Sequence, residues 1–374
     1  MKAWLRQWLL VLKSWFVAWL KLVLWPWRWW IAGRRRTDNA PEAVPTAAPA
    51  APTKPRRGVA RAKLVPAAKT RTKPKTRQRR PPVFATGTYH HATGQRDYKL
   101  YGAPVAGADP VPLVVMLHGC KQSPDDFALG TRMNQHAEAR GCMVLYPAQS
   151  RLANGYGCWN WFNPHDQARE GGETALLAGM VRHVMASHPV DPERVVVLGL
   201  SAGAAMAVNL ACAYPELVRG VGVHSGLPFG AAQGAMAAMK AMKQGAPFTG
   251  HWPARSLAVP VVIFHGDRDE VVHPVNAMQL VAQLTGTVWA GGAGVDAEAA
   301  MPVPAQAETV PAGAVRGYTR HVYRGADGQT VHEYWLVHGA GHAWSGGDVA
   351  GSYTEGDGPD ATREMLRFLL GPMN

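Results

Sequence analysis

The chain has 374 residues and 47% of them are hydrophobic, enough for one large α/β domain with additions or for two domains at most. Its net charge of +13 is uneven: residues 1–82 hold 20 Lys and Arg against Asp38 and Glu42, whereas the remainder carries −5. The basic character therefore belongs to the N-terminal region and does not describe the rest of the chain. The four cysteines are too few for a disulfide scaffold, although they permit two bridges.

The first segment, residues 1–31, has the pattern of an amphipathic helix. On a helical wheel Trp and Leu side chains gather on one side and Lys and Arg on the other, which predicts a helix lying in a membrane interface. A spanning anchor is one alternative, but it would bury Lys13 and Lys21 at roughly 2.5–3.5 kcal/mol each. An atypical secretory signal is the other alternative, although Lys13 interrupts the apolar stretch that such a signal needs.

Residues 32–83 are predicted to be a linker. Ala, Pro, Lys and Arg dominate, and there is almost no aliphatic periodicity. Such a composition buries too little apolar surface to offset the entropy of ordering, so we expect an extended, disordered tether. No aromatic residues lie between the basic ones, and no nucleic-acid-binding motif is present, so specific nucleic-acid binding is not expected.

Residues 84–374 are predicted to form an α/β domain. Short β-branched runs alternate here with Ala-rich segments of helical character. The expected strands lie within 112–119, 141–147, 194–201, 218–226, 260–267 and 332–342, and the expected helices within 173–189, 202–216 and 274–284. Strands that alternate with helices predict a mostly parallel sheet covered by helices on both faces.

The turn after the strand at 194–200 carries Gly199-Leu200-Ser201-Ala202-Gly203, a G-x-S-x-G sequence. A strand before it and a helix after it are the setting of a nucleophile elbow, a sharp turn that lifts the serine hydroxyl above the sheet. The pentapeptide alone is a modest signal, because roughly one chain in ten of this length contains it by chance. Ser201 is predicted to be the nucleophile if an acid and a base follow it.

The acid is expected in VVIFHGDRDEVVHP, where a strand ends and acidic residues follow. Functional loops of open α/β sheets gather at the carboxyl ends of the strands, and in this topology the acid comes after the serine. Asp269 is the first choice and Asp267 the second. Glu270 is possible on spacing alone.

The base is expected in YWLVHGAGHAWSGG, where a loop after a strand carries His338 and His342. His342 lies between Gly341 and Ala343, on a loop light enough to reach the nucleophile, and completes the chain order of serine, acid and histidine. The H-x-x-x-H spacing also suggests a metal pair. That interpretation is disfavoured because glycine interrupts the spacing and no acidic residue lies between the histidines.

The oxyanion hole is expected at PLVVMLHGCKQSP, where His118-Gly119 ends an early strand. A glycine there leaves the next backbone N–H free to point at a substrate oxygen. The predicted donors are the N–H groups of Cys120 and of Ala202, the residue after the nucleophile. An ordinary turn at the end of a strand is the alternative.

Taken together, five motifs resemble the type 1 catalytic domain of polyhydroxybutyrate depolymerases, whose relatives include feruloyl and acetyl-xylan esterases. The motifs are LHGCKQ, GCWNWF, GLSAG, HGDRDEVVHP and GAGHAWSGG, and the resemblance covers roughly residues 86–370. It implies an α/β-hydrolase fold and a Ser–Asp–His esterase. Acyl transfer by such a triad needs no cofactor, and no metal is expected. In the family patterns the acid matches Asp269 and the histidine matches His342.

The resemblance also implies a substrate cleft. Its expected substrate-binding residues are His118, Trp159, Trp161 and Trp344, with packing in the core as the alternative for the tryptophans. Cys120 and Cys158 flank the site in the matching motifs, so a bridge between them is a hypothesis, and a pairing of Cys142 with Cys212 stays open.

The expected activity is hydrolysis of polyhydroxybutyrate or its short oligomers. A feruloyl or acetyl-xylan esterase is the first alternative, and a surface-binding scaffold with an inactive hydrolase domain is the second. Residues 1–31 would suit a membrane or a storage-granule surface. Association with such a surface is the favoured location, and an extracellular location, typical of the family, is the alternative.

Overall fold

The computed structural model describes residues 83–102, 109–247, 257–289 and 301–372. The interfacial helix expected at 1–31, and all but the last residue of the linker expected at 32–83, lie outside these ranges. Within them, no helix combines the length and the apolar character that crossing a membrane requires.

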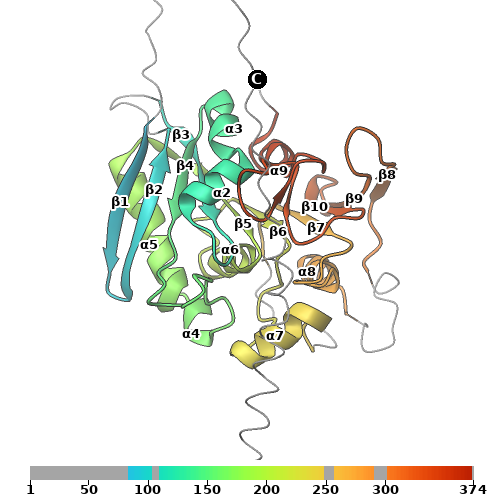
Figure 1. Cartoon of the computed structure of the whole chain (residues 1–374), viewed down its shortest axis with the longest axis horizontal. Helices are drawn as coiled ribbons and strands as arrows, with labels where there is room; N and C mark the ends of the chain where they lie inside the picture. Colours follow the sequence, from blue (N-terminus) through green and yellow to red (C-terminus); the bar gives the residue numbers. More distant parts are fainter. Residues whose placement is uncertain (1–82, 103–108, 248–256, 290–300, 373–374) are drawn as a thin grey trace, which may run out of the picture. The chain divides into compact units, whose positions relative to one another are not determined.

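The main structural feature is a ten-stranded sheet in the order β1-β2-β4-β3-β5-β6-β7-β10-β9-β8 (Figure 1). Its central strands are parallel neighbours and correspond to the β-branched runs of the sequence. They are β4 (Met143–Pro147), β3 (Val111–Leu117), β5 (Val190–Leu200), β6 (Gly220–His224), β7 (Val261–Gly266) and β10 (Thr330–Val337). The prediction of a mostly parallel sheet is therefore confirmed.

Antiparallel strands extend the sheet at both edges, which the sequence pattern did not predict. One edge holds β1 (Phe84–His91) and β2 (Gly94–Tyr101), and the other holds β9 (Tyr318–Arg324) and β8 (Gln306–Val310). A separate two-stranded ribbon joins β11 (Trp344–Ser345) to β12 (Thr354–Glu355).

Helices cover both faces of the sheet (Figure 1). One face carries α2 (Pro124–Thr131), α3 (Met133–Arg140) and α9 (Ala361–Leu370), and the other carries α5 (Gly172–Ser187), α6 (Ala202–Ala213) and α8 (Val275–Thr285). The short α4 (Pro164–Gln167) and α7 (Ala235–Gln244) lie toward the lower end of the view. This arrangement confirms the predicted helical layers of an α/β hydrolase.

The alternation of side chains along β5 explains why its run of apolar residues is continuous. Val195 and Val197 enter the hydrophobic core on one face, and Val196 and Leu198 enter the core on the other. All four side chains are fully buried. Because a central parallel strand is covered on both sides, each residue of the run gains stability from burial whichever way it points.

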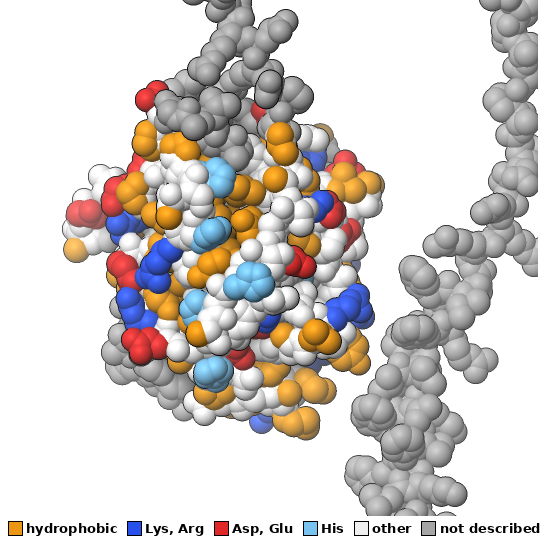
Figure 2. All heavy atoms as spheres, turned by 90° about the vertical axis from the view of Figure 1, so that its left-hand side faces the viewer, with side chains coloured by type: hydrophobic (Ala, Val, Ile, Leu, Met, Phe, Trp, Pro, Cys, Tyr) orange, Lys and Arg blue, Asp and Glu red, His pale blue; other side chains and the backbone are white. Residues whose placement is uncertain are grey.

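The β1 edge of the sheet is polar on its outer side. Figure 2 looks at this side of the molecule and shows histidine and charged side chains dispersed among hydrophobic ones. The exposed positions of β1 include Thr86, Thr88 and His90. An edge strand with polar side chains is less prone to pair with another chain than an apolar one.

Candidate active site

Ser201 occupies the sharp turn between β5 and α6. Its φ of 56° and ψ of −120° place a non-glycine residue in a conformation that L-residues rarely adopt. Such backbone strain costs about 1–3 kcal/mol and collects at functional sites. The Ser201 N–H donates to the carbonyl oxygen of His224 at 2.9 Å, which ties the turn to the end of β6. The turn thus has the geometry of a nucleophile elbow.

Two glycines make this turn possible because backbone atoms approach them closely. A Cβ on Gly203 would lie 2.0 Å from the carbonyl oxygen of Leu117. A Cβ on Gly199 would lie 2.4 Å from the carbonyl carbon of Gly203. The start of α6 is therefore packed directly against the end of β3, where the oxyanion hole is expected.

Asp269 lies in the loop after β7 and is nearly fully buried. Its Oδ1 accepts hydrogen bonds from the N–H groups of Val271 and Val272 at 2.9 and 2.8 Å. Its Oδ2 faces the ring of His342, with 2.7 Å between Oδ2 and Nδ1. One carboxylate oxygen is thus held by the loop backbone, while the other is directed at the candidate base.

The same contacts set the ionisation of this carboxyl. Burial raises the pKa of Asp269, but the hydrogen bond and charge of His342, with smaller contributions from His265 and the Val272 N–H, lower it to about 2. Asp269 is consequently an anion throughout the neutral range. An anion at Nδ1 favours the imidazole tautomer in which Nε2 is free to accept a proton.

His342 follows β10, in a loop next to the one that bears Asp269, because β7 and β10 are neighbours in the sheet. Its side chain is only 9% exposed. In the described part of the chain no hydrogen bond joins the Ser201 hydroxyl to this ring. Catalytic hydrogen bonds are often long without substrate and shorten in the reacting complex.

The alternative residues form a separate pair on the surface. The Asp267 Oδ1 accepts from the Gly339 N–H at 2.7 Å, and its Oδ2 lies 3.4 Å from His338 Nδ1. The other ring nitrogen of His338 contacts Thr319 at 3.0 Å. Glu270 is exposed. Asp267 and His338 are therefore engaged with each other, apart from the Asp269–His342 pair.

The expected oxyanion donors lie on the two segments that Gly203 brings together. Ala202 is the first residue of α6, so its N–H has no partner inside the helix. Neither this N–H nor that of Cys120 donates to a backbone carbonyl within the described ranges. Two donors without internal acceptors beside a serine turn are what an oxyanion hole requires.

The four expected substrate-binding residues lie deeper than the sequence suggested. His118, Trp159 and Trp344 expose at most 1% of their surface, and Trp161 exposes 5%. Trp159 Nε1 donates to the His118 carbonyl oxygen at 3.1 Å, and Trp344 Nε1 donates to the Thr362 hydroxyl at 3.0 Å. This burial favours the packing alternative, and their contact with substrate stays a prediction.

A disulfide joins Cys120 to Cys158, which is the bridge that the family resemblance suggested. It connects the expected oxyanion segment to the aromatic loop. Cys142 and Cys212 remain thiols, and burial raises the pKa of Cys142 to about 11. A thiol with so high a pKa is almost entirely protonated at neutral pH and is therefore a poor nucleophile.

Two buried histidines near the site were missed from the sequence. His224 stacks on the Trp344 ring at 5.1 Å, and its Nε2 accepts from the Ser345 N–H at 3.0 Å. His265 Nε2 contacts the Val272 carbonyl oxygen at 2.7 Å and lies 3.5 Å from the Asp269 carboxylate.

Burial lowers the pKa of His224 to about 3 and that of His265 to about 4, so both rings are neutral. The sequence does contain a signal that could have identified them. Both histidines lie at or beside the ends of strands that lead into the site, in GVGVHSG and VVIFHGD.

The sheet, its helical layers and the serine turn define an α/β hydrolase. Residues 96–303 match the family model described as "Esterase PHB depolymerase", which is more than half of the chain. The chain belongs to this family.

Curated relatives include a poly(3-hydroxyalkanoate) depolymerase C from Paucimonas lemoignei, 32% identical over 247 residues that cover 62% of this chain and 54% of the relative. Another is a feruloyl esterase B from Thermothelomyces thermophilus, 29% identical over 207 residues that cover 50% of this chain and 66% of the relative. The chain thus spans about half the length of the depolymerase and under two thirds of the feruloyl esterase.

Among solved structures, an acetyl xylan esterase from Aspergillus awamori aligns with a TM-score of 0.53 and 21% identity. The alignment covers 69% of this chain and 94% of that one. At this identity the likeness shows the fold alone. The family match and the curated relatives make the chain a protein of the PHB depolymerase, feruloyl and acetylxylan esterase type.

Proposed function

We propose that the chain is a serine esterase in which Ser201 is the nucleophile, His342 the base and Asp269 the residue that orients the base. The contact of 2.7 Å between Asp269 and His342, on loops that follow neighbouring strands, carries this proposal. The strained conformation of Ser201 at the end of another parallel strand supports it.

The reaction is a two-step acyl transfer. His342 Nε2 takes the proton of the Ser201 hydroxyl while the oxygen attacks the ester carbonyl. The N–H groups of Cys120 and Ala202 stabilise the negative oxygen of the tetrahedral intermediate. As the intermediate collapses, the ester C–O bond breaks and the leaving alcohol takes the proton from His342. Water then attacks the acyl-enzyme by the same route and releases the acid.

The substrate we favour is polyhydroxybutyrate or its short oligomers. The family description and the name of the Paucimonas lemoignei relative support a polyester substrate. A feruloyl or acetyl-xylan esterase is the second candidate, which the names of other relatives favour. A scaffold with an inactive hydrolase domain is the least favoured function, because Ser201, Asp269 and His342 are all present.

We also propose that residues 1–31 attach the enzyme to a membrane or to the amphiphilic surface of a storage granule. The support is the sequence pattern of Trp and Leu opposite Lys and Arg. Residues 32–83 would then serve as the tether of a catalytic domain that spans 84–374.

The decisive experiment measures release of 3-hydroxybutyrate from amorphous polyhydroxybutyrate granules by the full chain, beside p-nitrophenyl butyrate and methyl ferulate. Activity on granules and on the small ester establishes a polyester depolymerase. Activity on methyl ferulate without granule activity selects the feruloyl esterase. Ser201→Ala should abolish every activity without unfolding the protein, and retained turnover in that variant contradicts the assignment of the nucleophile.

A further inference from the structure

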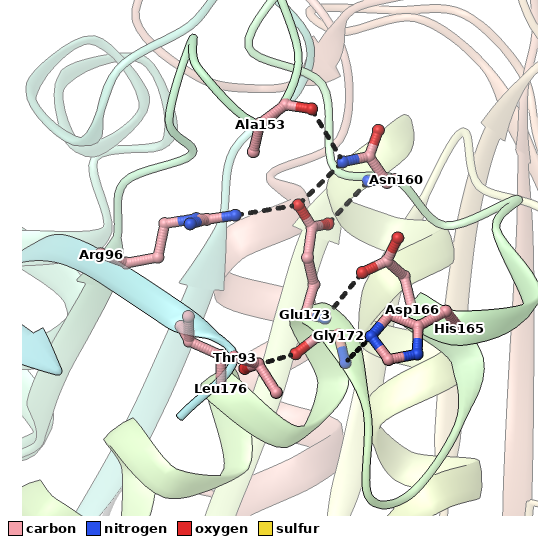
Figure 3. A pocket seen from close by; sticks show the side chains of 9 residues that line it. All are labelled: Thr93, Arg96, Ala153, Asn160, His165, Asp166, Gly172, Glu173 and Leu176. Carbon is pink, nitrogen blue, oxygen red and sulfur yellow. Dashed lines mark hydrogen bonds and ion pairs between the residues drawn. The ribbon is translucent and has the colours of Figure 1, made fainter. Parts of the chain in front are cut away.

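Glu173 is a buried carboxylate in the first turn of α5, away from the proposed triad. It is only 3% exposed and lines a pocket of about 200 Å³ between β2, the start of α5 and the loop that precedes α4 (Figure 3). A buried carboxylate costs free energy unless it is paired and hydrogen-bonded. The contacts of Glu173 therefore indicate what it holds in place.

Glu173 accepts hydrogen bonds from the loop that contains Gln149 and Asn160, and from β2. Its Oε2 accepts from the Asn160 backbone N–H at 2.7 Å, and its Oε1 accepts from the Asn160 side-chain amide at 3.0 Å (Figure 3). The same Oε1 accepts from Arg96 Nη2 at 3.2 Å and from the side-chain amide of Gln149. One carboxylate thus joins both ends of the 149–160 loop to the body of the domain.

This loop is attached in turn to the expected oxyanion segment. The disulfide connects Cys158 to Cys120, and the indole of Trp159 donates to the His118 carbonyl oxygen at 3.1 Å. The Gln149 N–H donates to His118 Nε2 at 3.1 Å.

One more contact lies on the other side of Cys120, where the Lys121 N–H donates to the Tyr156 carbonyl oxygen at 2.9 Å. The backbone on both sides of the Cys120 N–H is therefore held by the loop.

We propose that Glu173 is a positioning residue for the oxyanion hole, acting through the 149–160 loop and the Cys120–Cys158 disulfide on the Cys120 N–H. The role rests on the proposed esterase function. An oxyanion donor contributes to catalysis only if it points at the place where the negative charge develops. A small displacement of the loop moves the Cys120 N–H away from that place, although Glu173 touches neither the triad nor the substrate.

The electrostatics of the pocket agree with this role. Burial raises the pKa of the Glu173 carboxyl, and the hydrogen bonds from Gln149 and Asn160 together with the charge of Arg96 oppose that rise. Every one of its four side-chain contacts uses Glu173 as an acceptor. Glutamine has nearly the same shape but would turn an NH₂ group toward these donors, so Glu173→Gln tests the acceptor role with little change of volume.

The test measures kcat and KM of the full chain with p-nitrophenyl butyrate. Glu173→Gln should lower kcat by about 10- to 100-fold, because removing an oxyanion donor outright costs about 10²- to 10³-fold. KM should change by less than about threefold, since binding of the ground state does not use this donor. The dissociation constant of phenylboronic acid, whose adduct with Ser201 mimics the tetrahedral intermediate, should rise by about the same factor as kcat falls.

Glu170→Gln is the matched control, because Glu170 lies three residues away and is exposed. It should leave kcat, KM and phenylboronic acid binding unchanged. Asn160→Ala is the second variant, since it removes the amide contact with Glu173 and keeps the backbone N–H. The amide also bonds to Asn154 and Ala153, but both lie within the loop, and of these bonds only the one to Glu173 holds the loop to α5. The variant should therefore lower kcat by about threefold to tenfold, and it keeps the test valid if Glu173→Gln does not fold.

The outcomes separate the two proposals. Inactivity of the wild-type chain on all the esters overturns the proposed function and the positioning role with it. An active wild type with unchanged kcat in folded Glu173→Gln, or in Asn160→Ala, overturns the positioning role alone. A rise in KM without a fall in kcat also overturns it, because that result places Glu173 in substrate binding.

Discussion

Asp269 and His342 are 73 residues apart in the chain, yet 2.7 Å separates the carboxylate Oδ2 from the ring Nδ1. The other carboxylate oxygen is held by two backbone N–H groups of its own loop. The Asp269 carboxylate is thereby held by its own loop, and the Nδ1 side of the His342 ring faces it.

Replacing Asp269 by Asn should lower kcat by roughly 10³- to 10⁴-fold, because the amide supports the wrong tautomer of His342 and no longer stabilises the imidazolium. The matched control is Asp267→Asn, which alters the exposed pair with His338. It should change kcat by less than about threefold, as expected for an exposed ion pair. Steady-state kinetics with p-nitrophenyl butyrate measure both variants. A larger loss in Asp267→Asn than in Asp269→Asn would identify Asp267 as the acid.

The stability of the domain should fall as the pH falls from about 6.5 to about 4. Burial lowers the pKa of His224 to about 3 and those of His265 and His332 to about 4. In the unfolded chain each histidine titrates near pH 6.5. Between these values the unfolded state binds more protons than the folded state, so acid shifts the equilibrium toward unfolding.

Urea unfolding at several pH values gives the free energy of unfolding as a function of pH. Near pH 5 its slope should correspond to the uptake of about three protons on unfolding. His332→Gln should reduce the slope by about one proton, and His90→Gln, at an exposed position of β1, should leave it unchanged. The contribution of Asp269 behaves differently. Because its folded pKa is lowered to about 2, it stabilises the fold above pH 4 and is lost only as the pH falls further. If His332→Gln left the slope unchanged, the pH dependence would not come from the buried His332.

Removing the disulfide should affect both stability and catalysis. The bridge joins residues separated by 38 positions, and closing a loop of that length contributes about 4 kcal/mol to stability in the chain-entropy model. The double variant Cys120→Ser, Cys158→Ser keeps the backbone N–H at position 120. It should nevertheless unfold at a lower urea concentration and have a lower kcat than the wild type. Dithiothreitol should lower the kcat of the wild type and have no further effect on the double variant. Equal sensitivity of both proteins to the reductant would exclude this bridge as the cause.

Gly203→Ala should destabilise the domain by at least about 2 kcal/mol, because overpacking of a well-packed site typically costs about 1–3 kcal/mol and here the obstacle is backbone. The added Cβ would lie 2.0 Å from the Leu117 carbonyl oxygen and 2.6 Å from that of His118. Separation of α6 from β3 should also lower kcat. Gly313→Ala is the control, since nothing lies within 4 Å of its Cβ. The measurements are the denaturant midpoint of unfolding and kcat for both variants. Unchanged stability in Gly203→Ala would contradict the close packing of α6 against β3.

Deleting residues 1–82 tests the proposed anchor. The truncated chain should keep kcat on p-nitrophenyl butyrate, because the proposed catalytic residues all lie in the remaining part. Its hydrolysis of polyhydroxybutyrate granules should fall, since an interfacial helix raises the local concentration of enzyme at the surface. A deletion of residues 32–82 that keeps 1–31 is the control, because it separates loss of the linker from loss of the anchor. Full granule activity without residues 1–31 would remove the anchor from the proposal.

Much of the fold could be predicted because the central strands are simple in pattern. Covered on both faces, they require apolar residues at every position, and β-branched runs are visible without any tertiary information. The antiparallel strands at the edges of the sheet were not predicted. β1 and β2 mix exposed, partly buried and a few buried positions without a regular period and contain many polar residues, so they carry no comparable signal. Edge strands depend on the pairing partner for their stability more than on their own composition.

For the site, the residues along the chain were enough to predict the elbow around Ser201 and to place the expected acid and base in two loops, with Asp269 and His342 as the first choices. Those features are local, since they depend on glycines beside a serine and on loops that follow strands. The tertiary structure added the direct contact between Asp269 and His342 and the separate pair of Asp267 with His338. Only it brought Glu173 to Arg96, which lies 77 residues away. Such contacts depend on how β2, α5 and the loops at the strand ends pack together. That packing cannot be predicted from the spacing of residues along the chain.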